Sequence, residues 1–420
     1  MSFLLSLGRP GKGGGLHGCF LWGSRVGFNY QQRFSLVNVK LKWVKDRILD
    51  AAVTGQGDLK AACTLVSIIS GSRGGRVPVY HLSHHRGQLG LRDDVKVTSF
   101  LRRYPAVFGE ACVVDGGGTR VPCFYLTREA EDLRAEEVRV FEQSEGDLVE
   151  RLCKLLMLTR DRVLPFQTID QLRWDIGLPY GYADSVVPNY PDLFSSVNLL
   201  DDRVGLKLLV WDDHLAMSAF EKNALLQGRE GGAERGCAAF PVRFTRGFGL
   251  KRKCMAWLEE WQRLPYTSPY CNASHLDPRT DVSEKRIVGV FHEFLHLTLH
   301  KQTERKNVSN LRRPLSLPQK FTKVFERHPG IFYISMKNDT QTVVLREAYD
   351  QQQLLDKHPL VDIRERYAAL MRKGFLDRSK GLYKKDINAE ADATTRTKLW
   401  EVYHGDGTTE HEAVTGDYRS

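Results

Sequence analysis

The stretch Phe321-Thr-Lys-Val-Phe-Glu-Arg-His-Pro329-Gly-Ile-Phe332 carries the pattern that decides how the chain is built. Its bulky residues fall at the spacing of one buried helix face, namely Phe321, Val324, Phe325 and His328. Pro329 ends that helix, because proline has no N–H and disfavours the α region for the residue before it. Three residues later, Phe332 returns to the core. The stretch therefore predicts a helix, a proline stop and an aromatic plug.

The same pattern occurs twice earlier in the chain. The copies are Val97-Thr-Ser-Phe-Leu-Arg-Arg-Tyr-Pro105-Ala-Val-Phe108 and Ala183-Asp-Ser-Val-Val-Pro-Asn-Tyr-Pro191-Asp-Leu-Phe194. Pro188 lies inside the helix of the second of these copies, so we expect that helix to be shorter or kinked.

Each copy is followed by two apolar or β-branched runs that Gly, Asn or Asp separate, which is the signal of a β-hairpin. The paired strands are expected at 111–114 with 120–125, at 197–200 with 206–211, and at 333–336 with 342–345. The sequence thus predicts an α+β, helix-dominated fold that contains three winged-helix-like helix–hairpin units.

Further helices are predicted where apolar residues recur at helical spacing. They are expected at 41–53, 57–70, 148–158, 168–176, 252–263, 284–300 and 364–373. Ser283 is the expected N-cap of the helix at 284–300. Segment 228–247 is expected to be a loop, because it contains a Gly-Gly pair and a proline.

Composition limits the classes of function. The 420 residues are 42% hydrophobic, which excludes a wholly disordered chain, and no run approaches the ~18 apolar residues of a membrane span, so membrane insertion is not expected. The net charge of +10 makes an acidic polymer such as nucleic acid a candidate partner, although a merely basic surface remains open. The eight cysteines are scattered with no C-x-x-C pair, which favours free thiols over a disulfide scaffold.

The two ends differ from the middle. No Asp or Glu precedes Lys45, and this acid-free, Arg-containing start is typical of an organelle transit peptide, expected at 1–36. The start contains few Ser or Thr, and Arg33-Phe34-Ser35 resembles a mitochondrial processing site. The expected location is therefore the mitochondrion, with the chloroplast as the alternative. Residues 386–420 hold eight acidic and three basic residues and are expected to form a disordered acidic tail.

The region between these ends, 37–385, resembles the plant organelle RNA recognition (PORR) domain family. The resemblance rests above all on Leu172-Arg-Trp-Asp-Ile-Gly-Leu-Pro179, Lys285-Arg-Ile-Val-Gly-Val-Phe-His-Glu-Phe-Leu295 and Pro318-Gln-Lys-Phe-Thr-Lys-Val-Phe-Glu-Arg-His-Pro-Gly-Ile-Phe-Tyr333. It implies an RNA-binding protein that is not an enzyme and that promotes splicing of organellar group II introns. The implied partners are intron RNA and other splicing factors. This chain departs from the family at Phe294 and His296, where the family usually has Leu and Ser.

Clusters of basic residues, some with aromatic residues between them, are the candidate RNA-binding positions. Several such clusters on one chain fit a groove that follows a phosphate backbone, whereas a single cluster is more often a solvated face. The candidates are Arg102, Arg103, Arg243, Arg246, Lys251, Arg252, Lys253, Arg312, Arg313, Lys320, Lys323 and Arg327.

His292-Glu293-Phe294-Leu295-His296 formally matches H-E-x-x-H, the zinc-binding helix of metalloproteases. His300 is expected to share the same helix face. No other segment of the sequence clearly offers a third ligand, and two histidines do not make a zinc site. The sequence therefore predicts no cofactor and no metal, and a zinc enzyme is the weakest alternative. The other alternative is a winged-helix-like factor that binds organellar DNA.

Overall fold

The computed structural model describes residues 41–114, 120–230, 239–245, 247–249, 251–338 and 340–379. The expected transit peptide, the acidic tail and Arg246 lie outside the described residues. Within the described part, no helix is long and apolar enough to cross a bilayer. The six cysteines whose state is described are free thiols, as predicted.

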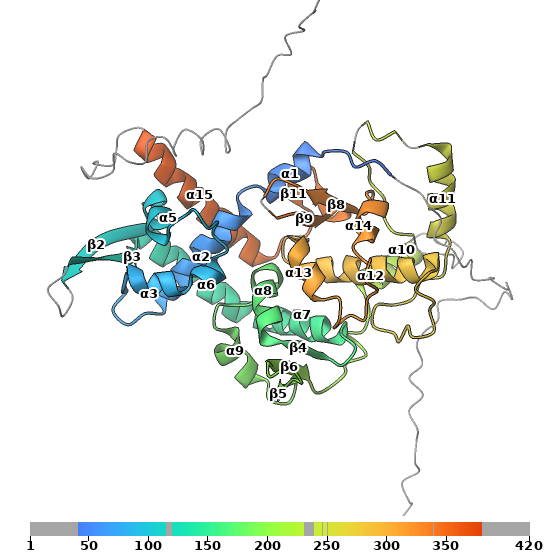
Figure 1. Ribbon diagram of the computed structural model, residues 1–420, viewed down its shortest axis with the longest axis horizontal. Coiled ribbons are helices and arrows are strands. Elements are labelled where there is room, and N and C mark those ends of the chain that lie inside the picture. Colours follow the sequence, from blue (N-terminus) through green and yellow to red (C-terminus); the bar gives the residue numbers. More distant parts are fainter. Residues whose placement is uncertain are drawn as a thin grey trace, which may run out of the picture.

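The molecule is a mixed helix and sheet protein in which three small sheets follow one order (Figure 1). Each sheet consists of a hairpin and a three-residue strand that pairs antiparallel with the second hairpin strand. The three sheets are β1(Arg76–Pro78), β2(Phe108–Val114), β3(Arg120–Leu126); β4(Val163–Pro165), β5(Phe194–Asn198), β6(Val204–Leu208); and β7(Gln302–Glu304), β8(Phe332–Ser335), β9(Thr342–Leu345). We call the surrounding regions the first, second and third units.

Each short strand leads directly into a helix. Pro78 and Pro165 end the first two short strands, since proline lacks the N–H that would extend the ladder but fits the first turn of a helix. The helices that follow the short strands are α3(Val79–His84), α8(Phe166–Ile176) and α13(Arg305–Asn310). α4(Arg86–Leu89) follows α3.

The repeated helix, proline and phenylalanine pattern behaves as predicted. The repeated helices are α5(Val97–Arg103), α9(Tyr182–Ser185) with the 3₁₀ turn η1(Val187–Asn189), and α14(Lys323–Arg327). Phe108, Phe194 and Phe332 are all buried at the start of the first hairpin strand. Pro188 lies in η1, and the second copy is broken there, which confirms the expected interruption.

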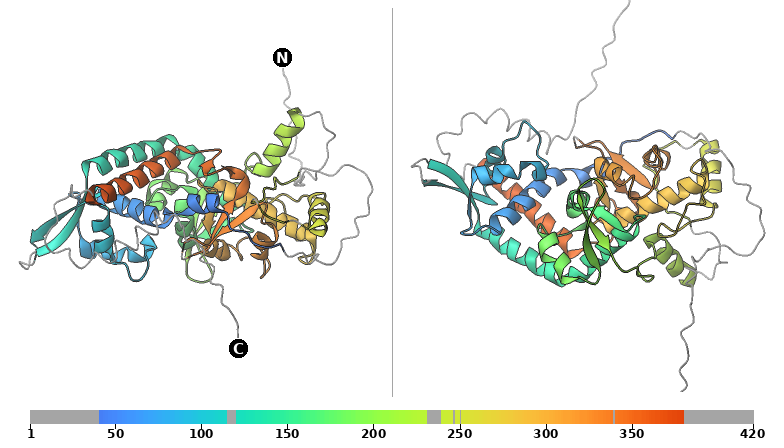
Figure 2. Two further views of the ribbon diagram at one scale, coloured as in Figure 1. Left: turned by 90° about the horizontal axis from the view of Figure 1, so that it is seen from above. Right: turned by 60° about the horizontal axis from the view of Figure 1, so that its bottom comes forward.

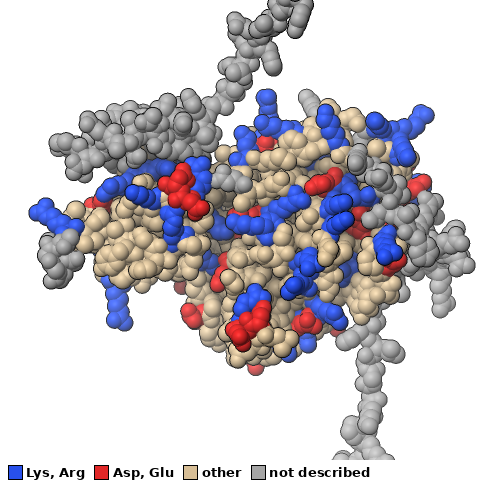
Figure 3. Space-filling model, viewed as in Figure 1, with Lys and Arg blue, Asp and Glu red and all other residues tan. Residues whose placement is uncertain are grey.

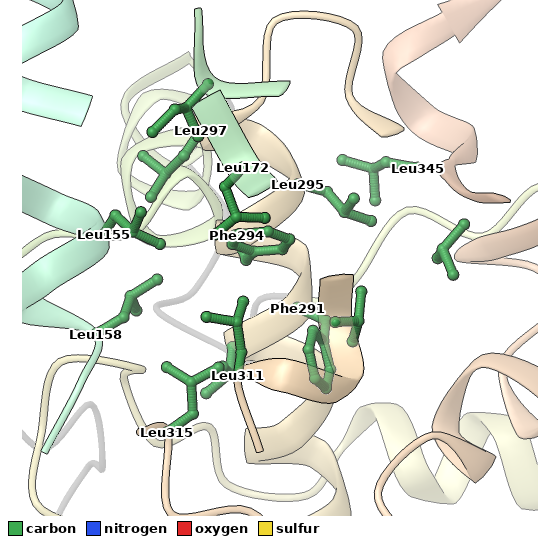
Figure 4. Close-up of a cluster of buried hydrophobic side chains, with 14 of the residues drawn as sticks. Leu155, Leu158, Leu172, Phe291, Phe294, Leu295, Leu297, Leu311, Leu315 and Leu345 are labelled. Carbon is green, nitrogen blue, oxygen red and sulfur yellow. The ribbon is translucent and has the colours of Figure 1, made fainter. Parts of the chain in front are cut away.

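Helix α12(Asp281–Leu297) runs through the larger of two hydrophobic cores. Figure 4 shows Phe294 and Leu295 of α12 among leucines from other elements, including Leu155, Leu172 and Leu345. Leu155 belongs to α7(Glu145–Met157), Leu172 to α8 and Leu345 to β9. Because α12 touches both the second and the third unit, these two units share one core.

The two ends of the described chain cross over, because each end packs on the unit that the other end of the chain forms. Helix α1(Arg47–Val53) packs against β8 of the third unit, although the chain then continues into the first unit. Helix α15(Pro359–Ser379) leaves the third unit and packs against α2(Gln56–Ser70) and α6(Arg128–Gln143) of the first, side by side in Figure 2. Tyr367 and Met371 of α15 are buried in the smaller core, which belongs to the first unit.

Several sequence expectations need correction. Residues 41–46 are not helical, because Asp46 caps α1 and its side chain accepts hydrogen bonds from the backbone N–H groups of Ile48 and Leu49. Thr280, not Ser283, caps α12 through a bond from the N–H of Ser283. Residues 228–230 are helical, at the end of α10(Ala219–Glu230), and are not part of a loop.

Some of the remaining elements lie near their predicted positions, and others were not predicted. α11(Arg252–Gln262) and α15 match the predicted helices at 252–263 and 364–373 in place, but α15 is longer. The sequence patterns did not predict the three short strands or the helices α3, α4, α6, α10 and α13. A further correction is that α12 ends at Leu297, before His300. The small hairpin β10(Tyr349–Asp350) and β11(Gln353–Leu354) follows the 3₁₀ turn η2(Arg346–Ala348).

Gly177, which ends α8, gives a test of this packing. Its φ is +85°, and a Cβ there would lie 2.6 Å from Cδ1 of Leu299. We expect Gly177→Ala to lose about 1–2 kcal/mol of unfolding free energy from the left-handed backbone and a further ~1–3 kcal/mol from overpacking. Gly90 is the matched control, because its φ is +65° and a Cβ there would meet nothing within 4 Å. Urea unfolding of both variants measures the difference, and equal losses would contradict the packing around Gly177.

Candidate nucleic-acid interface

The extended segment Leu41–Lys45 lies on the hairpin of the third unit. The indole Nε1 of Trp43 donates a hydrogen bond of 3.0 Å to the carbonyl oxygen of Ile334. The Trp43 ring stacks on the ring of Tyr333, with centroids 6.3 Å apart and planes 16° apart. Trp43 nevertheless remains 39% exposed. Its indole is therefore fixed in position and still open to solvent.

A pocket of about 230 Å³ lies between this segment, α14 and the third hairpin. Aromatic and basic side chains line it together, among them Trp43, Phe248, Phe332, Tyr333, Arg305 and Arg346. The ring of Trp43 stays exposed, and such a ring is a surface on which an unpaired base can stack. Arg346 is buried and hydrogen-bonded within the fold, so contacts to phosphate would have to come from the cations around the pocket.

A buried ion pair holds the segment in place. Nη1 of Arg346 lies 2.8 Å from Oδ2 of Asp46, and the hydroxyl of Thr245 donates to the same oxygen at 2.9 Å. Nε of Arg346 also donates to the carbonyl oxygen of Pro329 at 2.6 Å. Burial raises the pKa of Asp46, but the hydrogen bonds from Arg346 and Thr245 outweigh this effect and hold the pKa below its usual value.

A second carboxylate continues this network. Asp50, in α1, accepts hydrogen bonds from the hydroxyls of Tyr333 and Ser335 at 2.9 and 2.6 Å. The Tyr333 oxygen in turn accepts a bond from the backbone N–H of Asp46. Tyr333 therefore connects the start of α1 to the hairpin, directly beneath Trp43.

Exposed cations surround the pocket. Lys42 and Lys45 flank Trp43, Lys323 begins α14, and Lys337 follows β8. All four are exposed, and none forms an ion pair with another described residue. On the face in Figure 3, basic side chains outnumber acidic ones, and many gather at the upper right, where Figure 1 places α1 and α14. These lysines are free to contact an anion.

Lys251, Arg252 and Lys253 are exposed at the start of α11, and none of them pairs with an acidic residue of the described part. Lys251 occupies the N-cap position but makes no side-chain cap hydrogen bond. Cations at a helix N-terminus oppose the helix dipole. A role in stabilising α11 therefore does not account for this cluster. Phe248, which lines the pocket, precedes it by three residues.

Other predicted residues are engaged within the fold. Arg102 makes a two-point contact with Glu110 at 2.8 and 2.6 Å, and Arg103 lies 3.6 Å from Asp58. The side chain of Arg327 is only 15% exposed; it pairs with Glu284 at 2.9 Å and lies over the ring of Trp257.

The remaining predicted residues lie nearer the surface. Nη1 of Arg243 donates to the carbonyl oxygen of Tyr349 at 2.9 Å, although much of the residue is exposed. Arg313 and Lys320 are exposed, and Arg312 is half-buried. The structure thus brings Lys323 close to the pocket, while Arg102 and Arg103 belong to the first unit.

The sequence reasoning missed the pocket itself. The alternation Lys42-Trp43-Val44-Lys45 was an available signal, because an isolated tryptophan between lysines is unusual in a buried helix face. The helix predicted at 41–53 hides this signal, because it makes Trp43 part of a first helical turn. Arg305 and Arg346 could not be linked to Trp43 without the fold.

The H-E-x-x-H stretch forms a second cluster. Nε2 of His292 and Nε2 of His296 lie 2.7 and 2.8 Å from the same oxygen, Oε1 of Glu347. Glu347 belongs to η2, so the expectation that no separate segment supplies a third ligand is wrong. His300 does not join them; its Nδ1 lies 3.2 Å from Arg364.

Burial controls the protonation of this cluster. Burial lowers the pKa of His296, and nearby Lys301 adds to this effect, although the hydrogen bond to Glu347 opposes it. Burial also lowers the pKa of Lys301, to about 8. Burial raises the pKa of Glu347, but the two histidines outweigh it and hold that pKa well below its usual value. The carboxylate of Glu347 is therefore ionised at neutral pH.

Three known proteins are similar to the chain over most of its length. The Arabidopsis thaliana protein named WHAT'S THIS FACTOR 9, mitochondrial, is 34% identical over 374 residues, which cover 86% of this chain and 95% of that protein. The Zea mays protein named WHAT'S THIS FACTOR 1, chloroplastic, is 33% identical over 333 residues, which cover 78% of this chain and 66% of that protein. The Arabidopsis thaliana protein named ROOT PRIMORDIUM DEFECTIVE 1 is 30% identical over 309 residues, which cover 70% of this chain and 75% of that protein.

No solved structure matches the chain. The family model described as the plant organelle RNA recognition domain matches residues 44–376. This match begins at Val44, directly after Trp43, and ends within α15, so it includes all three units and both chain crossings. It confirms the resemblance seen in the sequence motifs, and the chain belongs to the plant organelle RNA recognition domain family.

Proposed function

We propose that this chain is an RNA-binding protein of a plant organelle that promotes splicing of group II introns and is not itself an enzyme. The family supports an organellar RNA-binding role. The observation that carries the proposal is the aromatic and basic pocket at Trp43, Tyr333 and Phe248, with its exposed lysines. An intron of this kind is its own catalyst, so the protein needs to bind and shape RNA and needs no catalytic residues of its own.

RNA would make two kinds of contact at this site, one to its phosphates and one to an unpaired base. Lys42, Lys45, Lys323 and Lys337 would neutralise phosphates around the pocket, and the cluster Lys251, Arg252 and Lys253 would extend the basic surface. Trp43 would stack on an unpaired base, which is the usual way in which proteins capture single-stranded RNA. Together these contacts would hold an intron segment in a splayed conformation. Other splicing factors are proposed as further partners.

The three units, each with a short strand, a helix and a hairpin, support a winged-helix-like description. That likeness keeps duplex DNA as the alternative ligand, since winged helices often bind duplexes. The pocket favours RNA, because an exposed stacking ring requires an unstacked base. Competition of structured intron RNA against duplex DNA of equal length distinguishes the two, and preference for the duplex would reject the RNA proposal.

The proposed domain plan is a transit peptide at 1–36, an RNA-binding region at 37–385 and a disordered acidic tail at 386–420. We propose the mitochondrion as the location, since the start has arginines but few Ser or Thr. The similar proteins include both a mitochondrial and a chloroplastic one. Residues 1–60 fused to a fluorescent reporter should enter mitochondria, and signal confined to plastids would assign the protein to chloroplasts.

Trp43→Ala should weaken binding to single-stranded RNA. Base–aromatic stacking contributes about 1–3 kcal/mol by alanine substitution, so we expect a loss of roughly 5- to 150-fold in affinity with an unchanged salt slope. Tyr80→Ala is the matched control, because Tyr80 is 49% exposed but lies in α3 of the first unit. Fluorescence anisotropy with labelled intron RNA measures both. Similar losses in the two variants, or none in Trp43→Ala with an intact fold, would place the RNA elsewhere.

The triple variant Lys251→Ala, Arg252→Ala and Lys253→Ala tests the phosphate contacts. Each contacted phosphate contributes about 0.7 to the slope of log affinity against log salt for single strands, so the slope should become shallower by roughly two. The control triple is Arg73→Ala, Arg128→Ala and Arg139→Ala, which removes the same charge from exposed positions of the first unit. Titrations at several salt concentrations give the slopes. An unchanged slope in the first triple would show that these three cations do not contact RNA.

A further inference from the structure

We propose that His292, His296 and Glu347 bind one zinc ion, which joins the core helix α12 to η2. The two histidines lie four residues apart on α12, so their rings share one helix face. Glu347 approaches from a separate element, 51 residues after His296. Two imidazoles and one carboxylate form a donor set that protein zinc sites use, with water as the fourth ligand.

The distances fit a site that a metal can enter with a small adjustment. The ligand atoms of the three side chains all lie within 4.8 Å of one another. In a tetrahedral zinc site, with bonds of about 2.0–2.2 Å, donor atoms lie about 3.3 Å apart. The two nitrogens now lie 2.7 and 2.8 Å from Oε1 of Glu347. Separating these atoms by about half an ångström would make room for the ion.

Unmet bonding capacity in the cluster also points to a cation. Both imidazoles converge on one oxygen of Glu347, while its other oxygen, Oε2, is buried and has no hydrogen-bond partner in the described part. A buried carboxylate oxygen without a partner is costly. On binding zinc, each Nε2 would give up the proton that it now donates to Oε1 and use its lone pair for the ion, and the carboxylate would become the third ligand.

The surroundings provide a partly dry site with one open side. The side chains of His292 and Glu347 are 1% and 11% exposed, whereas that of His296 is 21% exposed. The rings of Phe220 and Phe240 lie edge-on to the His292 ring, with centroids 6.1 and 5.2 Å away. Apolar walls strengthen charge interactions inside the site. The exposed side at His296 gives the metal a path of entry and leaves space for a water ligand.

The site is not a protease centre, because the glutamate that would act as base in a protease is engaged elsewhere. The carboxylate of Glu293 is fully buried and lies 2.7 Å from Nζ of Lys154. It also accepts hydrogen bonds from the hydroxyl of Tyr270 and the N–H of Ala219. It is therefore not free to activate a water. Hard ions such as Mg²⁺ and Ca²⁺ prefer oxygen ligands alone, so zinc fits a site with two imidazoles better than either ion does.

Metal content of the full chain, purified with a histidine-free affinity tag from zinc-supplemented cells, tests the proposal. We expect one zinc per chain in the unaltered protein. Glu347→Gln and His296→Ala should each lose it on dialysis, with zinc affinity reduced by more than ~100-fold, because changing a residue that merely hydrogen-bonds a metal ligand already costs about 10–100-fold. Added zinc should raise the unfolding temperature of the metal-free unaltered protein but not that of either variant.

Glu284→Gln is the matched control. Glu284 is also a buried carboxylate, and it lies 2.8 Å from His328, but it contacts one histidine only. This variant should keep its zinc. Circular dichroism checks that each variant is folded, and Co²⁺ in place of zinc should give weak visible bands without the intense charge-transfer band of a cysteine ligand. Zinc retained in both cluster variants, a thiolate band, iron in place of zinc, or no zinc in the unaltered protein would each overturn the proposal.

Discussion

The buried ion pair between Asp46 and Arg346 is the contact on which the candidate interface depends. It joins two residues 300 positions apart and fixes three segments at once, because Thr245 binds the same carboxylate. Removing one partner of such a pair typically costs about 3–5 kcal/mol, since the other charge stays buried without compensation. Without this pair, the segment that carries Trp43 would lose its connection to η2.

Arg346 and Glu347 are neighbours in η2, yet they serve two different sites. Arg346 faces Asp46 and the aromatic pocket, whereas Glu347 faces the two histidines of α12. The short turn is thus held on one side by an ion pair and on the other by the histidine cluster. A change in one cluster that shifts η2 should also move the side chain that η2 places in the other cluster, because Arg346 and Glu347 are adjacent in a 3₁₀ turn of three residues.

Local patterns were enough to predict the repeated elements but not the contacts between them. The helix, proline and phenylalanine pattern is short-range, and Phe108, Phe194 and Phe332 are buried as expected. The strands β1, β4 and β7 have only three residues each, too few to show a period of two, and they exist because a distant hairpin pairs with them. Glu347 and Trp43 were missed for the same reason, since their partners lie far away in the sequence.

The crossing of the chain ends determines the order in which the protein can fold. Helix α1 emerges early from a ribosome or a translocation pore, but its docking surface on β8 follows almost 300 residues later. The first unit likewise lacks α15 until nearly all of the described chain has appeared. Both cores would stay open during that interval, and exposed apolar surface of this kind invites aggregation. The protein should therefore depend on chaperones until α15 is released.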